Sequence, residues 1–195
     1  MNKKDTIFYK TMKPVLVFLM YFLFRPTIIG KNNIPKDKAL VLAGNHIKWL
    51  DSIMLCAVVG KRQIHFLTKI ELFKGPFRIV TKGMGAIPVN HKPHDKSALK
   101  TAVDFLKEGL CIGVFPEGEI NRTNSVILPF KIGAVKMSQE SNATLVPFVI
   151  TGKYKLFRKN LKIEFLKPLK IDDDLEITNQ KLMKVIKDKI RKKKK

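Results

Sequence analysis

Short apolar segments that alternate with helix-like segments constrain the fold of this chain more than any other feature. The strand-like segments are residues 39–43, 63–68, 86–89, 110–115, 144–150 and 161–165, and the helix-like segments are residues 52–59, 97–107 and 131–140. Strands that alternate with helices favour an α/β fold with a largely parallel sheet. For a chain of 195 residues, we expect a single α/β domain with a mostly parallel central sheet flanked by helices.

The amino-terminal segment is basic and then strongly apolar. Residues 15–24 form an unbroken run of ten apolar residues that Arg25-Pro26 ends. A bilayer-spanning helix needs about 20 such residues, so a shorter run is typical of a core helix, an interfacial segment or a signal-peptide core. No small-x-small cleavage site follows, which argues against a secretory signal. The basic flank and the aromatic residues in and beside the run favour a membrane-associating anchor, with a core helix as the alternative.

The formal net charge of +22 indicates an anionic partner, which can be nucleic acid, an anionic membrane surface or a phosphorylated substrate. Residues 181–195 alone carry nine basic residues and one acid, in a predicted helix that Thr178 or Asn179 would cap. This segment is either a solvated basic tail or an added contact to anionic lipid. Because no RNA-recognition signature is present, we expect no nucleic acid partner.

The two cysteines indicate a reducing compartment. Cys56 and Cys111 both lie in apolar segments and match neither a zinc pattern nor a disulfide framework. We therefore expect two buried core thiols. His65, His91 and His94 also lack metal-ligand spacing with any carboxylate or cysteine, so no metal site is expected.

A histidine and an aspartate follow the first predicted strand. The Gly44-Asn45 break places His46 in a strand-to-helix connection and Asp51 at the start of the next helix. Five residues on one helix would put these side chains roughly 140° apart, so they meet only if the chain turns between them. A buried aspartate bonded to one imidazole nitrogen fixes the tautomer and leaves the other nitrogen free as a base. The alternative is a solvated loop histidine and a helix-capping aspartate.

A second polar segment follows a later strand. Phe115-Pro116-Glu117-Gly118 comes directly after residues 110–115, and α/β folds build their sites beyond the carboxyl ends of their strands. Glu117 can accept hydrogen bonds from a hydroxyl, and Gly118 lets the backbone approach a ligand. Arg122 can hold a phosphate through two parallel hydrogen bonds. Taken alone, the Pro-Glu-Gly segment also suits an ordinary structural turn.

Four sequence blocks in order resemble the glycerolipid acyltransferase family typified by bacterial 1-acyl-sn-glycerol-3-phosphate acyltransferase. The blocks are Asn45-His46-x4-Asp51, then Lys69-Ile70-Glu71-Leu72-Phe73 running to Gly85-Ala86-Ile87-Pro88-Val89, then Phe115-Pro116-Glu117-Gly118, and last Leu145-Val146-Pro147-Phe148-Val149-Ile150-Thr151-Gly152. Pro129-Phe130-Lys131-x-Gly133-Ala134 also fits the family's pattern. The resemblance covers roughly residues 29 to 170.

The resemblance implies transfer of a fatty acyl group from acyl-CoA or acyl carrier protein to the sn-2 hydroxyl of 1-acyl-sn-glycerol-3-phosphate, which gives phosphatidic acid for phospholipid biosynthesis. His46 would be the general base and Asp51 would orient it. No cofactor or metal is expected beyond the thioester co-substrate. The same chemistry on glycerol-3-phosphate or another lysolipid is an alternative. An alternative of another class is a non-catalytic basic module that binds membrane or nucleic acid.

Two departures from the family pattern bear on the acceptor. Asn90-His91 stands where an acid-Arg pair is usual, and Glu119-Ile120 stands where Thr-Arg is usual. We expect Lys69, His91 and Arg122 to contact the acceptor phosphate instead. The full set of expected substrate-binding residues is Asn45, Lys69, His91, Glu117, Gly118 and Arg122.

These observations divide the chain into three expected parts. They are a membrane-associating segment over residues 1–28, an acyltransferase domain over residues 29–172 and a basic helix or tail over residues 173–195. The first part would hold the protein as a peripheral or monotopic protein on the cytoplasmic face of the cell membrane. Abundant Lys, Ile and Asn are typical of bacteria with AT-rich genomes.

Overall fold

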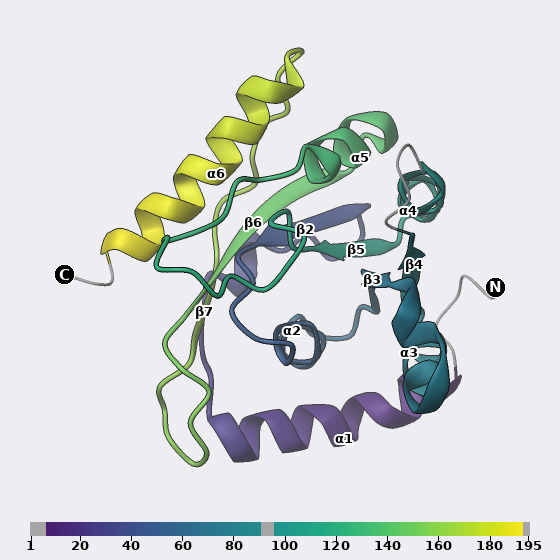
Figure 1. Ribbon diagram of the computed structural model, residues 1–195, viewed down its shortest axis with the longest axis vertical. Helices are drawn as coiled ribbons and strands as arrows, with labels where there is room; N and C mark the ends of the chain where they lie inside the picture. Colours follow the sequence, from purple (N-terminus) through teal and green to yellow (C-terminus); the bar gives the residue numbers. More distant parts are fainter. Residues whose placement is uncertain (1–6, 91–95, 193–195) are drawn as a thin grey trace.

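The chain folds around one seven-stranded sheet with the order β1-β7-β6-β2-β5-β3-β4 (Figure 1). The computed structural model describes residues 7–90 and 96–192. The strands are β1 Thr27–Ile29, β2 Leu40–Gly44, β3 Ile64–Lys69, β4 Ile87–Val89, β5 Cys111–Val114, β6 Thr144–Thr151 and β7 Lys162–Phe165. All neighbouring strands pair in parallel except β6 and β7, which are antiparallel. The predicted α/β fold with a mostly parallel sheet is confirmed.

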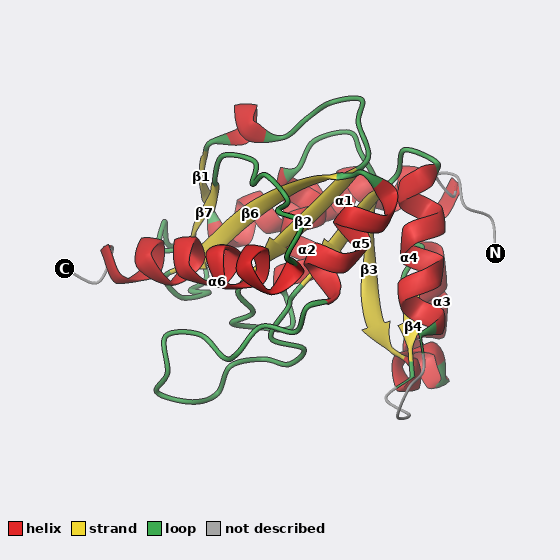
Figure 2. Ribbon diagram, turned by 90° about the horizontal axis from the view of Figure 1, so that it is seen from above, coloured by secondary structure: helices red, strands yellow, loops and turns green. Residues whose placement is uncertain are grey.

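Helices cover both faces of the sheet (Figures 1 and 2). They are α1 Ile7–Phe24, α2 Asp51–Val58, α3 Arg78–Gly83, α4 Ser97–Lys107, α5 Gly133–Ser141 and α6 Leu175–Lys192. Short 3-10 turns are η1 Lys31–Asn33, η2 Ile70–Phe73 and η3 Gly75–Phe77. Helix α2 packs on one face, with α1 outside it, and α4, α5 and α6 pack on the other face.

Strand β2 shows how the sequence builds the two halves of the core. Its side chains alternate, so that Leu40 and Leu42 join the core on the α1 and α2 side, while Val41 and Ala43 join the core on the α4, α5 and α6 side. All five residues of β2 are buried. A central parallel strand covered on both faces requires such a continuous apolar segment, which is why this strand was predictable.

Helix α1 packs on α2 through one narrow face. Tyr9, Met20 and Phe24 are buried, whereas Phe18 is 66% exposed and Phe22 is 53% exposed. Among the described residues, α1 is the one helix long and apolar enough to cross a membrane, with a mean hydropathy of 1.5. Only 17% of it is buried, which does not fit the alternative of a core helix.

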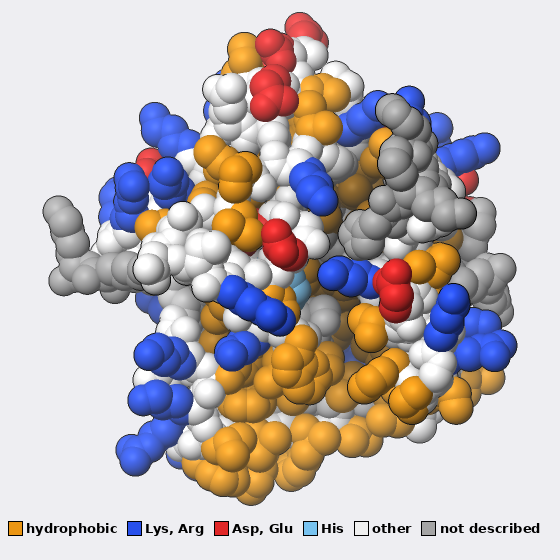
Figure 3. All heavy atoms as spheres, viewed as in Figure 1, with side chains coloured by type: hydrophobic (Ala, Val, Ile, Leu, Met, Phe, Trp, Pro, Cys, Tyr) orange, Lys and Arg blue, Asp and Glu red, His pale blue; other side chains and the backbone are white. Residues whose placement is uncertain are grey.

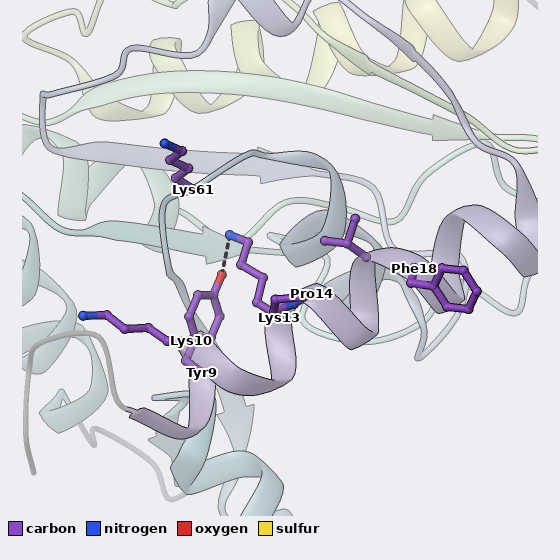
Figure 4. A pocket seen from close by; sticks show the side chains of 7 residues that line it. Tyr9, Lys10, Lys13, Pro14, Phe18 and Lys61 are labelled. Atoms are coloured by element: carbon purple, nitrogen blue, oxygen red, sulfur yellow. Dashed lines mark hydrogen bonds between the residues drawn. The ribbon is translucent and has the colours of Figure 1, made fainter.

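Polar contacts hold the beginning of α1 beside a groove of about 600 Å³, and Figure 4 shows the contact between Lys13 and Tyr9. The Tyr9 hydroxyl donates to the Arg62 carbonyl at 3.0 Å, and Lys13 Nζ donates to the Tyr9 oxygen at 2.9 Å. Lys61 also lines this groove and lies just before the amino-terminal end of β3. The groove is therefore at the opposite end of the sheet from the segment that follows β2.

Three details differ from the sequence-based expectation. Thr27–Ile29, which is not among the predicted strand-like segments, is an edge strand that pairs in parallel with β7. Helix α1 begins at Ile7 and passes through Pro14, although proline removes one backbone hydrogen bond. Helix α6 is part of the domain rather than a solvated tail, because Leu182, Ile186 and Ile190 lie in the core.

We predict that both cysteines resist labelling in the folded protein. Cys56 and Cys111 are 2% and 1% exposed, and burial raises the pKa of each thiol to about 12. Because only the thiolate reacts and a raised pKa leaves little of it at pH 8, a disulfide reagent should modify neither residue until the protein unfolds. Rapid modification of two thiols per chain without denaturant, followed by absorbance, would contradict this.

Candidate active site

The candidate site lies at the edge of the sheet where the parallel strands end. Strands β2, β5 and β3 are neighbours and end at Gly44, Val114 and Lys69. Parallel strands present their carboxyl ends at one edge, so the segments after them lie close together there. This topology brings the His46 segment and the Glu117 segment into contact although they are distant in sequence.

His46 and Asp51 form a hydrogen-bonded pair. His46 Nδ1 lies 2.9 Å from Asp51 Oδ2. The chain turns after β2, and Asp51 is the first residue of α2, which supplies the turn that one continuous helix would lack. Because the carboxylate only accepts, Nδ1 carries the proton and Nε2 keeps a lone pair on the opposite side of the ring. The His46 side chain is 17% exposed, so part of the ring is accessible from solvent.

Asp51 is fully buried and is held by several donors at once. Its Oδ2 also accepts the backbone N–H groups of Ile47 at 2.7 Å and Lys48 at 2.8 Å. Its Oδ1 accepts the Tyr154 hydroxyl at 2.7 Å. Burial and the nearby Asp51 carboxylate raise the pKa of Tyr154 far above its ordinary value, so this hydroxyl stays protonated and keeps donating. These bonds compensate the desolvation of the carboxylate and fix its orientation.

Glu117 braces the backbone of His46. Its Oε1 accepts the His46 N–H at 2.9 Å, and its Oε2 accepts the Leu128 N–H at 2.7 Å. The residue is 5% exposed, and burial raises the pKa of its carboxyl, while the bonds from Leu128 and His46 act in the opposite direction. The side chain thus joins the β2–α2 connection to the loop that follows β5. Its predicted contact with substrate stays a prediction.

The imidazole of His46 packs against Phe115. The two rings stack with centroids 4.0 Å apart and an interplanar angle of 13°. Phe115 also contacts Phe66 and Phe148, so the ring that supports the base is continuous with the core. Together with Asp51 this packing leaves the imidazole little freedom to rotate.

The side chain of Asn45 bonds to the backbone of a neighbouring strand. Its Nδ2 donates to the Ile150 carbonyl at 2.9 Å, and its Oδ1 accepts the Ile150 N–H at 2.8 Å. Asn45 is 3% exposed, so the amide ties the end of β2 to β6. A substrate contact by Asn45 stays a prediction and would require these two bonds to open.

Several backbone donors that suit an oxyanion are already engaged. The N–H groups of Ile47 and Lys48 donate to Asp51, and the Gly118 N–H donates to the Phe115 carbonyl at 2.9 Å. A strong oxyanion donor must point at the developing charge rather than at a protein acceptor. These three amides therefore do not serve that role in the geometry described.

Cationic side chains surround the pair. Lys69 is exposed at the end of β3, and Arg122 is exposed beside Asn121, whose N–H donates to the His46 carbonyl at 3.1 Å. Gly118 has a φ of 77°, and a Cβ placed there would lie 2.8 Å from Lys131 Nζ. The space-filling view shows histidine atoms in a hollow with Lys and Arg side chains around it (Figure 3). His91 lies outside the described residues.

Sequence reasoning missed two residues that the structure adds to the site. Tyr154 donates to Asp51 across 103 positions, and Phe115 was quoted only as part of a motif, not as the support of His46. The one sequence signal for Tyr154 was its position shortly after β6, a strand that ends at the same edge of the sheet as β2. Lys131 was quoted in the family pattern, and its position over Gly118 makes it a further candidate for phosphate contact.

Comparisons with known proteins identify the family of this chain. The profile of the Acyltransferase family matches residues 25–151. A 1-acyl-sn-glycerol-3-phosphate acyltransferase of Bacillus subtilis (strain 168) is 35% identical over 147 residues, which are 73% of this chain and 72% of that protein. The chain therefore belongs to the Acyltransferase family, as its ordered motifs predicted.

Two further comparisons concern one more relative and one solved structure. A 1-acyl-sn-glycerol-3-phosphate acyltransferase of Borreliella burgdorferi is 31% identical over 137 residues, which are 69% of this chain and 54% of that protein. The crystal structure of the 1-acyl-sn-glycerophosphate (LPA) acyltransferase PlsC of Thermotoga maritima matches with a TM-score of 0.76, over 96% of this chain and 78% of that one. At 21% identity this structural likeness shows the fold alone.

We predict that Tyr154→Phe lowers kcat roughly tenfold to hundredfold, because a hydrogen bond to a charged group contributes about 1.5–3 kcal/mol. The hydroxyl donates to Asp51, so we expect it to act through the orientation of that carboxylate and KM to stay unchanged. Tyr21→Phe, which removes an exposed hydroxyl on α1, is the matched control. A kcat that equals that of the wild type would show that Asp51 needs no such donor.

We predict that Glu117→Gln destabilises the fold by about 1–3 kcal/mol, since a glutamine has one acceptor oxygen and leaves the N–H group of either His46 or Leu128 without its acceptor. Urea unfolding measures this change. Unchanged stability combined with lost activity would instead assign Glu117 to direct contact with the substrate. The two readouts thus separate the bracing role from the binding role.

Proposed function

We propose that this protein is an O-acyltransferase that moves a fatty acyl group from a thioester carrier to the sn-2 hydroxyl of 1-acyl-sn-glycerol-3-phosphate, giving phosphatidic acid. The observation that carries the proposal is the His46–Asp51 pair with its free Nε2 at the carboxyl edge of the sheet, in a chain of the Acyltransferase family. The names of the relatives, both 1-acyl-sn-glycerol-3-phosphate acyltransferases, support the acceptor. The carrier is CoA or acyl carrier protein.

The proposed reaction uses His46 as general base and then as general acid. Nε2 takes the proton of the acceptor hydroxyl while its oxygen attacks the thioester carbonyl carbon. The new C–O bond forms, the C–S bond breaks, and the proton on Nε2 passes to the leaving thiolate. Asp51 stabilises the imidazolium that forms between these steps and keeps the productive tautomer. No acyl-enzyme and no cofactor are required.

We infer that cations around the pair hold the acceptor phosphate. Lys69, Arg122 and Lys131 are exposed on segments that meet at this edge. Arg122 suits two-pronged contact with phosphate, whereas lysine acts as a point charge. Since Glu119 and Ile120 replace the usual Thr-Arg pair, these three cations, with His91, are the candidates for head-group contact.

We further propose that α1 holds the enzyme on the cytoplasmic face of the membrane as a peripheral or monotopic protein. The helix exposes Phe18 and Phe22, which lie in its unbroken apolar run over residues 15–24. The net charge of +22 supports attraction to an anionic surface. This location would place the site beside the bilayer that contains its acceptor and its product.

The test is acyl transfer by purified wild type and His46→Ala, with acyl-CoA and with acyl carrier protein as donors. The acceptors are 1-acyl-sn-glycerol-3-phosphate, glycerol-3-phosphate and a lysolipid without a free phosphate monoester. We expect wild-type turnover with the first acceptor and a fall of at least about 100-fold in the variant, which is the low end for a lost general base.

The other outcomes are also informative. Turnover only with glycerol-3-phosphate would replace the proposed acceptor and keep the chemistry. Turnover that survives in His46→Ala would sink the mechanism. Vesicle binding without turnover on any acceptor would favour the non-catalytic membrane-binding module. Near-ultraviolet circular dichroism confirms that the variant is folded, because loss of the ring stacked on Phe115 can disturb packing.

A further inference from the structure

The loop between β6 and β7, residues 152–161, extends the apolar surface of α1. Leu156 is 59% exposed and Phe157 is 52% exposed, values similar to those of Phe18 and Phe22 on α1. The rings of Phe22 and Phe157 meet edge to face with centroids 5.6 Å apart. Figure 3 shows an apolar band along its lower edge, where Figure 1 places α1 and this loop. The loop tip and the helix therefore form one surface.

The exposed position of Phe157 is fixed by the fold. Its φ is 58°, a conformation that bulky residues rarely adopt. Its backbone N–H donates to the Leu23 carbonyl at 2.6 Å, so the loop tip caps the last turn of α1. At the base of the loop, the Lys153 N–H donates to Asn160 Oδ1 at 3.1 Å and holds the two ends together. Such strain persists only where the surrounding structure holds it, often for function.

The charge around the tip fits an anionic bilayer. Lys155, Arg158 and Lys159 are exposed directly beside the two apolar residues, and residues 152–161 contain no acid. An apolar tip flanked by cations is the pattern of segments that dip into the interface and attract anionic head groups. Nucleic acid would account for the cations but not for the adjoining aliphatic and aromatic surface.

The root of the same loop reaches the catalytic pair. The ring of Tyr154 packs edge to face on Phe24 of α1, with centroids 5.2 Å apart, and its hydroxyl donates to Asp51 at 2.7 Å. One short segment thus connects the apolar surface with the residue that orients His46.

We propose that the β6–β7 loop is a second membrane-contact element beside α1, in which Leu156 and Phe157 enter an anionic bilayer while Lys155, Arg158 and Lys159 lie among the lipid phosphates. This inference rests on the membrane-bound acyltransferase proposed above. Contact through both α1 and the loop sets the orientation of the domain on the bilayer, since a surface formed by two elements restricts rotation about the helix axis that a single helix would allow. Tyr154 then keeps the dyad aligned in that docked orientation.

The direct test places a single tryptophan at the loop tip. Trp49 is the chain's one tryptophan, so Trp49→Phe combined with Phe157→Trp gives a probe at the tip. Trp49→Phe combined with Ile177→Trp is the control, because Ile177 is 47% exposed on α6, away from α1. We expect blue-shifted emission and quenching by brominated lipid in phosphatidylcholine–phosphatidylglycerol vesicles for the tip probe only. A tip probe that is not quenched on vesicle-bound protein overturns the proposal.

Vesicle partition of loop variants gives a second test. Leu156→Ser with Phe157→Ser should weaken partition roughly tenfold to hundredfold, since about half of each side chain is available for burial in lipid. The control Ile177→Ser should leave partition unchanged. Equal partition by the double variant and the wild type overturns the proposal.

Charge variants test the head-group contact. Replacing Lys155, Arg158 and Lys159 by glutamine should lower partition by about tenfold or more when phosphatidylglycerol is present, and little with phosphatidylcholine alone. The same three-charge change at Lys96, Lys100 and Lys107, on and beside α4, is the matched control. An equal loss in the control would assign the effect to net charge and overturn a specific loop contact.

Activity on a short-chain acceptor below its critical micelle concentration separates this inference from the proposed function. Leu156→Ser with Phe157→Ser should retain turnover of that monomeric acceptor and lose turnover of an acceptor embedded in vesicles. If the wild type turns over neither acceptor, the proposed function fails and the partition results still decide the loop. If the variant retains turnover on vesicles and binds them normally, the loop inference fails and the enzyme assignment stands.

Discussion

The buried carboxylate of Asp51 is the interaction on which the site depends. A carboxylate removed from water is strongly destabilising unless donors surround it. Here the donors are His46 Nδ1, the backbone N–H groups of Ile47 and Lys48, and the Tyr154 hydroxyl, at 2.7 to 2.9 Å. Satisfying this one group therefore fixes the turn after β2, the orientation of the imidazole and the position of the β6–β7 loop. The geometry that stabilises the fold locally is also the geometry that leaves Nε2 available for the proposed role as a base.

The sheet edge brings the remaining parts together. Glu117 follows β5, which is the neighbour of β2, and its two oxygens bond to the His46 and Leu128 backbone. Phe115 from the same segment supports the ring. Both contacts join the connection between β2 and α2 to the segment that follows β5. They therefore limit the motion of His46.

The fold was predictable where strands are long and buried, and less so at the edges. Strand β2, Leu40–Gly44, was predicted at residues 39–43. The reason is that a short continuous apolar segment bounded by turn-forming residues is typical of a buried strand. Strand β1, Thr27–Ile29, has three residues, which are too few for an alternation of apolar and polar residues to indicate a strand. It exists because it pairs with β7, which lies more than a hundred positions away and stands beside it only in the folded sheet.

The sequence by itself determined the membership of the family, the pairing of His46 with Asp51, and the apolar character of the amino-terminal helix. Those properties depend on residue type and local spacing, which a sequence states directly. The tertiary structure decided that Tyr154 serves Asp51 and that the amide of Asn45 is bound to Ile150, contacts that span 103 and 105 positions. The physical reason is that hydrogen bonds between distant segments depend on strand order and packing, and local periodicity carries no information about either.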